Sequence, residues 1–409
     1  MKQGGKYLNR KPKKQRLRGF VRGVLTFLAA AVCLTATLPM MKGMVLHVGS
    51  PLKQEYKKGQ DLQIREELEG ILTNDIAALL GSVQPLPGGE EETVEPVKPV
   101  KKFFWLKDED LVAPEPDQSK FGETDDPATL QWLIDEAAEL LEGQELYFDP
   151  ASTQIIQGTK VTYYLDDTIL AITWKEMHDF SVYTFSEVKI AHASQFRRFL
   201  ADGEYGSEKQ YLTTEMAQSV NAVVASSGDF YRFREFGAVV YEGQVRRVRG
   251  DLTDTCLIDK NGDLHFFRKG EVLDVETAQT FVDEHEVRFS LCFGPVLIEN
   301  GERCVPGHYL LGEIDEEYAR AGLCQMGKLH YILAAANTEG AYQQVPTLFQ
   351  FAASLEKTGC DKAFALDGGQ TAAIVMNDQL INRPVKGSQR KISDIIYFAT
   401  AIPSFGDKG

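Results

Sequence analysis

The chain has 409 residues, 43% of them hydrophobic, and its 44 basic and 59 acidic side chains give a formal net charge of −15. This composition excludes a disordered or fibrous protein, and the length predicts two or three domains. Residues 1–22 hold nine basic residues and no acidic one, so the rest of the chain carries a net charge of −24. Because so acidic a surface repels phosphates, we expect no non-specific binding of nucleic acid.

An uncharged and mostly apolar run over residues 23–41 follows the basic segment. Its length is close to the roughly 20 residues that span a bilayer. We therefore predict a single-pass transmembrane anchor over residues 23–48. Basic residues on its N-terminal side place residues 1–22 in the cytoplasm as a tail and the C-terminal part outside the cell membrane. A cleaved signal peptide is the alternative, but the run is long for a signal core and no clear small-x-small cleavage site follows it.

Residues 49–152 are interpreted as an extracytoplasmic stalk. Residues 61–80 and 127–141 have the apolar spacing of short helices. Between them, residues 82–126 contain six prolines and an acidic cluster. A segment of this composition buries little apolar surface, which predicts a flexible spacer.

From residue 153 to residue 409 the pattern changes to short β-rich runs, the first over residues 161–174, with helical patterns at 191–201 and 345–357. Four turn signals separate pairs of runs, and Asn-Gly in particular supplies the positive φ angles of a tight hairpin. The predicted fold class is α+β, a mixed and largely antiparallel sheet with flanking helices. The four hairpin turns are Glu242-Gly243, Asn261-Gly262, Asn300-Gly301 and Asn377-Asp378.

Common catalytic signatures are absent from the sequence: there is no GxSxG, HExxH, P-loop, GxGxxG or CxxC. The seven histidines and the cysteines have no metal-ligand spacing, so we predict no metal and no other cofactor. Cys292 and Cys304 flank a predicted hairpin, but its register does not support a disulfide between them.

Two apolar strands run into a glycine turn that carries a carboxylate. The first ends at Ser227-Gly228-Asp229 and the second at Asp367-Gly368-Gly369. Carboxylates at the ends of core strands, beside glycines that permit close approach of the backbone, are suited to holding a polar ligand. The alternative is that Asp-Gly is turn chemistry alone.

Seven segments in a fixed order extend over most of the chain after residue 155. They are TYYLDDTILA, ASQFR, SSGDFYRFREFGAVVYEGQVRR, FGPVLIENGE, an isolated Arg320, ALDGGQTAAIVMNDQLINRP and RKISDIIYF. In this order they resemble the phosphodiester glycosidase family, and bacterial, exopolysaccharide-associated members with an N-terminal anchor are the most similar in organisation. The resemblance implies that residues 153–409 hydrolyse a sugar-1-phosphodiester between the anomeric carbon and the phosphate-bearing oxygen.

The same resemblance implies the site residues. Arg320 is the expected cation beside the phosphate, since a guanidinium matches phosphate geometry. Asp229 and Asp367 are expected to share the sugar side as paired carboxylates, with their individual roles left open. All three are expected to open onto one concave surface. Gly228, Gly368 and Gly369 are expected to form part of its floor, with their missing side chains leaving room for a sugar ring. The implied substrate-binding residues are Ser227, Gly228, Asn337, Gly368, Gly369, Gln370, Thr371, Arg383 and Arg390.

Several motif positions depart from the family pattern. Ser227 replaces Asn, Ala321 replaces Thr, Gln370 replaces Gly and Asn337 replaces an acidic residue. Two hypotheses follow. The first is an extracytoplasmic hydrolase that acts on cell-surface polysaccharide or related glycoconjugates. The second is a degenerate relative that binds a sugar-phosphate polymer without turnover, in exopolysaccharide or wall assembly.

Overall fold

The computed structural model describes residues 106–402, apart from residues 108–109, 152–154, 310–313, 340–341 and 343. The predicted cytoplasmic tail, the anchor over residues 23–48 and the stalk helix over residues 61–80 lie outside this part. Among the described residues, no helix is both long and apolar enough to cross a membrane.

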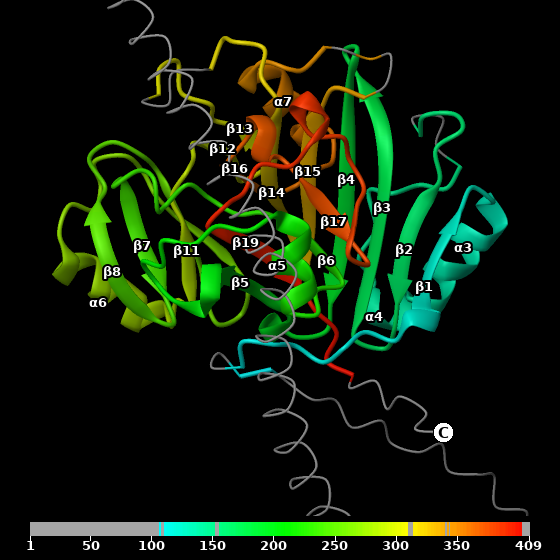
Figure 1. Ribbon diagram of the computed structural model, residues 1–409, viewed down its shortest axis with the longest axis horizontal. Coiled ribbons are helices and arrows are strands. Elements are labelled where there is room, and N and C mark those ends of the chain that lie inside the picture. The colour runs from blue at the N-terminus through cyan, green and yellow to red at the C-terminus, as the bar shows by residue number, and fades with distance from the viewer. Residues whose placement is uncertain are drawn as a thin grey trace, which may run out of the picture. The chain divides into compact units, whose positions relative to one another are not determined.

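The largest sheet has nine strands, and every neighbouring pair in it is antiparallel. It extends from the strands that precede residue 191 to those that follow residue 295 (Figure 1). In spatial order the strands are β1 (Phe121–Thr124), β2 (Val161–Leu165), β3 (Ile169–His178), β4 (Ser181–Ile190), β15 (His330–Asn337), β14 (Arg320–Gly327), β16 (Lys362–Leu366), β12 (Val296–Glu299) and β13 (Glu302–Arg303).

Two five-stranded antiparallel sheets complete the β structure. The first has the order β10 (Leu264–Phe267), β9 (Thr255–Ile258), β11 (Phe289–Leu291), β7 (Gly237–Tyr241) and β8 (Gln244–Arg249). The second has the order β18 (Gln379–Leu380), β17 (Ile374–Met376), β6 (Val224–Ser227), β19 (Asp394–Phe398) and β5 (Phe196–Leu200). The predicted largely antiparallel architecture is confirmed.

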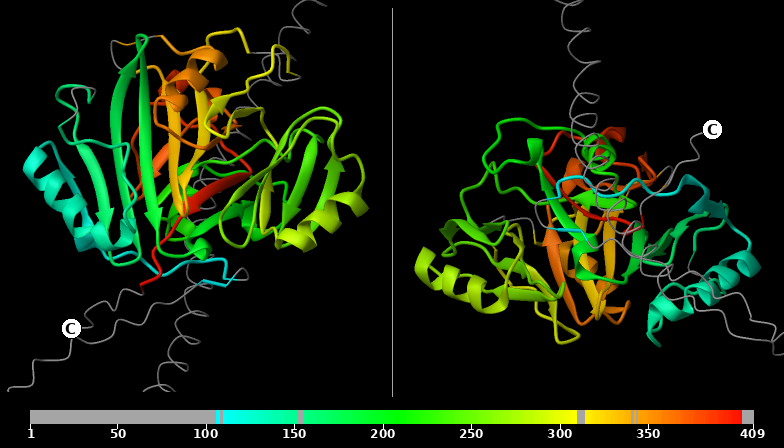
Figure 2. Two further views of the ribbon diagram at one scale, coloured as in Figure 1. Left: turned by 180° about the vertical axis from the view of Figure 1, so that it is seen from behind. Right: turned by 90° about the horizontal axis from the view of Figure 1, so that it is seen from below.

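Few helices accompany the sheets, and the longer ones begin at side chains that accept a hydrogen bond from the first turn. Asp126, Asp274 and Thr347 have this role for α3, α6 and α7. In both views α3 lies beside β1 and α6 beside β8, at opposite ends of the sheets (Figures 1 and 2). The α-helices are α3 (Pro127–Glu136), α4 (Ala138–Leu141), α5 (Thr213–Ser219), α6 (Val275–His285) and α7 (Leu348–Glu356), and short 3₁₀ turns are η1 (Gln118–Lys120), η2 (Ala193–Gln195), η3 (Ala201–Gly203), η4 (Gly369–Thr371) and η5 (Val385–Gly387).

The nine-stranded sheet is buried on both faces, as the alternation along β15 shows. Tyr331 and Leu333 join a core shared with the other two sheets, whereas Ile332 and Ala334 join a core that contains α3, α4 and α7. Because successive side chains of a strand point to opposite faces, a strand covered on both sides reads as a continuous apolar run. The sequence of β15, HYILAAAN, has this pattern.

The four predicted hairpins are confirmed, since β7–β8, β9–β10, β12–β13 and β17–β18 pair as expected. Asn300 and Gly301 have φ angles of 54° and 76°, the left-handed values that the turn requires. The helix predicted over residues 191–201 is wrong. These residues form η2 and β5 because all five residues of β5 pair with β19, and this tertiary pairing overrides the local pattern.

The flexible spacer predicted over residues 82–126 is wrong for its described part. Strand β1 pairs with β2, and the ring of Phe121 packs against Tyr164 with the centroids 4.6 Å apart. Ala113 is fully buried, and its carbonyl accepts a hydrogen bond of 2.8 Å from the amide of Asn221. Prolines suit extended chain, and the described part of this stretch, which contains Pro114 and Pro116, packs against the sheets.

Candidate active site

Strand register brings Arg320 and Asp367 together. Arg320 opens β14, Asp367 follows the last residue of β16, and the two strands are antiparallel neighbours. Ala321 lies opposite Leu366 in this pairing. The next residues along each strand, Arg320 and Asp367, therefore meet where β14 begins and β16 ends. The two side chains are 47 positions apart in sequence, and only this pairing makes them neighbours.

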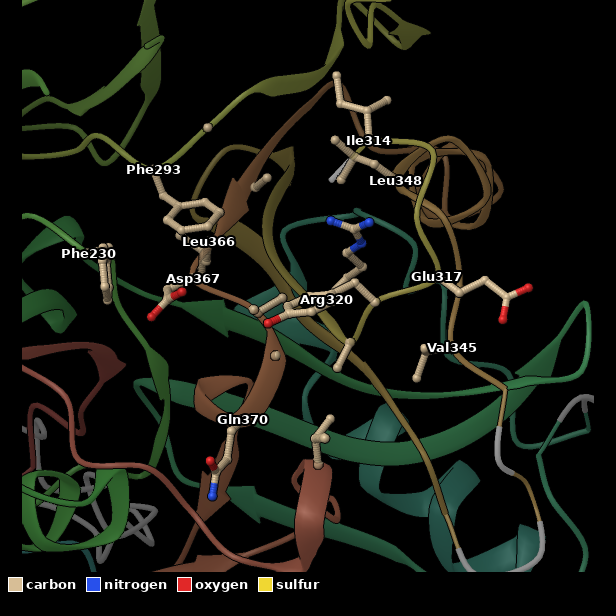
Figure 3. Close-up of a pocket in the computed structure, with 18 of the residues that line it drawn as sticks. Phe230, Phe293, Ile314, Glu317, Arg320, Val345, Leu348, Leu366, Asp367 and Gln370 are labelled. Atoms are coloured by element: carbon tan, nitrogen blue, oxygen red, sulfur yellow. The ribbon is translucent and has the colours of Figure 1, made fainter. Parts of the chain in front are cut away.

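Both residues line a cavity of about 470 Å³ (Figure 3). Its walls combine apolar and aromatic side chains with six charged ones, of which four are basic and two acidic, a mixture suited to a polar anionic ligand. The charged residues are Arg234, Arg320, Lys386, Arg390, Glu317 and Asp367.

The Arg320 side chain lies deep in this cavity, with 9% of the residue exposed. One terminal nitrogen donates a hydrogen bond of 2.7 Å to the backbone carbonyl of Glu316, and the guanidinium carbon is 5.7 Å from the ring centroid of Tyr318. Figure 3 shows the guanidinium directed toward the apolar side chains of Ile314 and Leu348. In such surroundings a cation attracts an anion more strongly than it does in water.

The Asp367 carboxyl lies between Phe230 and Arg320 in the close-up view (Figure 3). Burial raises its pKa to about 7, against the opposing effects of the Thr371 hydroxyl, Arg390 and Arg234. A carboxyl that exchanges its proton near neutral pH is suited to act as a base or an acid in catalysis.

Asp229 is placed differently from the sequence-based expectation, because it does not line this cavity and only 3% of it is exposed. One carboxylate oxygen accepts a hydrogen bond of 2.7 Å from the backbone N–H of Cys292, and the other accepts one from the N–H of Tyr231. The carboxylate is also 3.3 Å from Nη2 of Arg198. These contacts fix the turn that carries Phe230, and Phe230 lines the cavity.

Sequence reasoning missed the buried pair of Arg198 and Asp394 that supports this turn. Arg198 Nε donates a hydrogen bond of 2.9 Å to Asp394 Oδ2, and the same oxygen accepts one of 3.1 Å from the N–H of Asp229. Burial raises the pKa of Asp394, and the positive charge of Arg198 opposes the rise. The available signal was the two arginines within FRRFL and the aspartate that begins the otherwise apolar DIIYF.

The glycines of the two turns make room for protein atoms. A Cβ at Gly228 would lie 2.2 Å from Asp394 Oδ2, and one at Gly368 would lie 2.5 Å from the carbonyl oxygen of Ala319. Gly369 has a φ of +66°, and a Cβ there would lie 2.8 Å from the ring of Tyr318. The expectation that their missing side chains leave space for a sugar is therefore corrected. They let the turns pack closely, although Gly368 and Gly369 still border the cavity.

The remaining predicted substrate-binding residues divide into two groups. Gln370 and Arg390 line the cavity, and the Gln370 amide donates a hydrogen bond of 3.1 Å to the carbonyl of Ser388. The residues that do not line it are Ser227, Asn337, Thr371 and the exposed Arg383. The Ser227 hydroxyl lies 3.5 Å from the Asp367 carbonyl, and the Thr371 hydroxyl donates a hydrogen bond of 2.6 Å to the Gly368 carbonyl. Asn337 is buried and accepts a hydrogen bond from the amide of Asn382.

In the part of the chain that the structure describes, no cluster of three or more His, Cys, Asp or Glu side chains is arranged to hold a metal ion. The five cysteines among these residues are present as free thiols, including Cys292 and Cys304.

Residues 220–399 match the family model for phosphodiester glycosidases. These residues form a phosphodiester glycosidase domain. The matched segment contains every residue that lines the cavity, including Arg320 and Asp367. It also contains Asp394 of the buried pair.

Two solved structures resemble this chain at low identity. A hypothetical protein from Synechocystis is 14% identical with a TM-score of 0.42, and the match covers 59% of this chain and 64% of that one, less than two thirds of its length. The catalytic domain of zebrafish N-acetylglucosamine-1-phosphodiester alpha-N-acetylglucosaminidase, auto-inhibited by its pro-peptide, is 18% identical with a TM-score of 0.42, and the match covers 58% and 81%. No curated protein matches this chain.

Proposed function

We propose that the cavity hydrolyses a sugar-1-phosphodiester of a cell-surface polysaccharide or related glycoconjugate. The observation that carries this proposal is the meeting of Arg320 and Asp367 in one cavity of a phosphodiester glycosidase domain. A cation for the phosphate and a carboxyl for the sugar are the two groups that this reaction needs.

In the proposed reaction the bond between the anomeric carbon and the phosphate oxygen breaks, and the electron pair leaves with the phosphate. The departing phosphomonoester is a stable anion, so it needs a neighbouring cation more than a proton donor, and Arg320 supplies that cation. A water molecule adds its oxygen to the anomeric carbon, and its proton passes to the Asp367 carboxylate. The products are the free sugar and the phosphomonoester.

The choice between the two aspartates follows from their contacts. Asp229 is engaged by two backbone N–H groups and by Arg198. These bonds occupy the oxygens that would have to take a proton from water. Asp367 has a pKa raised to about 7 and faces the cavity, so we assign the base to Asp367 and a positioning role to Asp229.

The test is release of free sugar by the purified full-length protein from a panel of nucleotide sugars and phosphate-containing wall-polymer fragments. We expect release by the wild type and a fall of about 10²–10⁴-fold in Asp367→Asn, the range typical for loss of a general base. Asp251→Asn is the matched control, because Asp251 is exposed and does not line the cavity.

One observation favours the second candidate, a binding protein without turnover. The Gln370 side chain lies at the cavity and bonds to Ser388, where the family motif has a glycine. Saturable binding of the same fragments with no release of sugar from any of them would support this candidate.

We also propose that residues 23–48 anchor the protein in the cell membrane, with the glycosidase domain outside. The proposal is supported by the basic residues on one side of the apolar run. It agrees with a polysaccharide substrate at the cell surface.

A further inference from the structure

Three basic side chains lie together at the edge of the cavity, on a protein that is otherwise strongly acidic. Arg234 follows the turn after β6, Lys386 lies in η5, and Arg390 precedes β19. All three are exposed, and all three border the same cavity as Arg320 and Asp367. We call Arg234, Lys386 and Arg390 the basic rim.

Two members of the basic rim surround one aromatic ring. The guanidinium carbon of Arg234 is 5.4 Å from the ring centroid of Phe230, and that of Arg390 is 5.8 Å from it. A guanidinium packed on an aromatic ring keeps its N–H groups available at its edges for an oxyanion. Two positive charges therefore lie near the same ring. Their mutual repulsion is unfavourable, and an anion bound between them would relieve it.

No carboxylate in the described part of the chain forms an ion pair with Arg234, Lys386 or Arg390. Other exposed arginines have such partners: Arg249 is 3.5 Å from Glu235, and Arg246 is 3.3 Å from Glu242. Lys386 has a left-handed φ of 67°, an uncommon backbone conformation for a non-glycine residue. The rim thus keeps three cations at the cavity edge, none of them in an ion pair with a carboxylate of the described residues.

The aromatic ring that two rim guanidiniums contact and the Arg320 side chain lie on different sides of Asp367. In Figure 3 Asp367 lies between Phe230, which carries two of the rim's guanidiniums, and Arg320. The positive fields of Arg234 and Arg390 reach Asp367, since both lower the pKa of its carboxyl. A sugar placed at Asp367 would have a cation site on each side.

We propose that the basic rim is a second phosphate subsite, so that the substrate is a sugar unit with a phosphate on each side, as in the interior of a sugar-phosphate polymer. This inference rests on the proposed function for the position of the scissile phosphate at Arg320. The second phosphate is carried by the sugar itself, because Phe230, with two rim guanidiniums near its ring, and Arg320 lie on different sides of Asp367 (Figure 3). A pyrophosphate, as in a nucleotide sugar, would place both phosphates on the Arg320 side.

The experiment measures binding by calorimetry to the full-length protein, so that it does not depend on turnover. The probes are N-acetylglucosamine 1-phosphate, N-acetylglucosamine 1,6-bisphosphate and UDP-N-acetylglucosamine. We expect the bisphosphate to bind the wild type about 10–100-fold more tightly than the monophosphate, the range expected for charge-assisted contacts to one phosphate. The double variant Arg234→Gln/Arg390→Gln should lose this advantage and keep its affinity for the monophosphate.

Lys391→Gln is the matched control, because Lys391 is an exposed neighbour of Arg390 that does not line the cavity. It should retain the full preference for the bisphosphate. Equal affinity of the wild type for the first two probes would overturn the proposal, and so would a preference that survives the double variant. A rim-dependent preference for the UDP-sugar alone would overturn the placement of the second phosphate on the sugar. Rim-dependent binding of the bisphosphate without release of sugar from any substrate would support the subsite and contradict the hydrolase.

Discussion

Arg198 and Asp394 form an ion pair in which both side chains are completely buried, with Nη2 of the arginine 2.8 Å from the carboxylate. The same nitrogen lies 3.3 Å from the carboxylate of Asp229, so one cation serves two acids. The pair joins β5 and β19 directly beneath the turn that carries Phe230.

We expect Arg198→Met to destabilise the protein by about 3–5 kcal/mol, because the substitution leaves two carboxylates buried without their cation. Urea denaturation at pH 8 measures the loss. Arg249→Met removes an exposed ion pair and should cost less than about 1 kcal/mol. A similar small loss in both variants would show that Arg198 does not support this turn.

Gly228 leaves no room for a side chain, since a Cβ there would lie 2.2 Å from Asp394 Oδ2. Gly228→Ala should push the turn away from the buried pair and destabilise the protein by about 1–3 kcal/mol, the usual cost of overpacking. The control is Gly307→Ala, because a Cβ at Gly307 has no atom within 4 Å. Equal unfolding midpoints for the two variants in a thermal scan would contradict the close packing.

Local sequence signals predicted the hairpins, because the backbone conformation of a tight turn depends on the few residues that form it. Asp229 shows where such signals end. Its Ser-Gly-Asp turn is visible in the sequence, but its burial depends on Arg198, which is 31 positions earlier and belongs to a run that was predicted to be helical. The sequence contains no local indication that this arginine crosses beneath the turn, because that contact is created by the pairing of β5 with β19.

Arg320 and Asp367 were expected to meet because of a family resemblance, since no periodicity relates residues 47 positions apart. The register of β14 and β16 supplies the physical reason. The basic rim was only partly foreseen: Arg390 belongs to a recognised motif, whereas Arg234 and Lys386 look like ordinary surface residues until the fold places them at the cavity.

The buried carboxyl of Asp367 should reduce the stability of the folded protein when it is ionised, because burial disfavours its charged form. Because the pKa of Asp367 in the folded state is raised to about 7, the protein loses stability as the pH increases from about 4 to about 7 and this carboxyl ionises. Asp367→Asn should therefore be more stable than the wild type by about 2–4 kcal/mol at pH 8 and equally stable at pH 4. Urea denaturation at the two pH values measures the difference.

The exposed-site variant Asp251→Asn is the control for Asp367→Asn, and it should show no such gain at pH 8. A gain of the same size at pH 4 and pH 8 would mean that the effect does not come from ionisation. Loss of stability in Asp367→Asn at pH 8 would contradict the raised pKa.

The proposed orientation in the membrane predicts where an added protease cuts intact cells. We expect removal of the C-terminal domain by a cut between residues 82 and 105, the proline- and glutamate-rich stretch that precedes the packed residues from 110 onward. Immunoblotting with an antibody against the C-terminal domain follows the reaction. Survival of the full-length protein until the cells are permeabilised would reverse the orientation.

The pH dependence of turnover tests the role of Asp367. A base must be ionised to accept a proton from water, so kcat/KM for a substrate with a single phosphodiester should rise with pH through about 7 and then level off. Arg390 lowers the pKa of this carboxyl, so Arg390→Gln should shift the rise to higher pH. Lys391→Gln removes a neighbouring charge outside the cavity and should leave the profile in place. If the rise stays at the wild-type pH in Arg390→Gln, or if kcat/KM falls as the pH increases through 7, the group that controls the reaction is not the Asp367 carboxylate acting as a base.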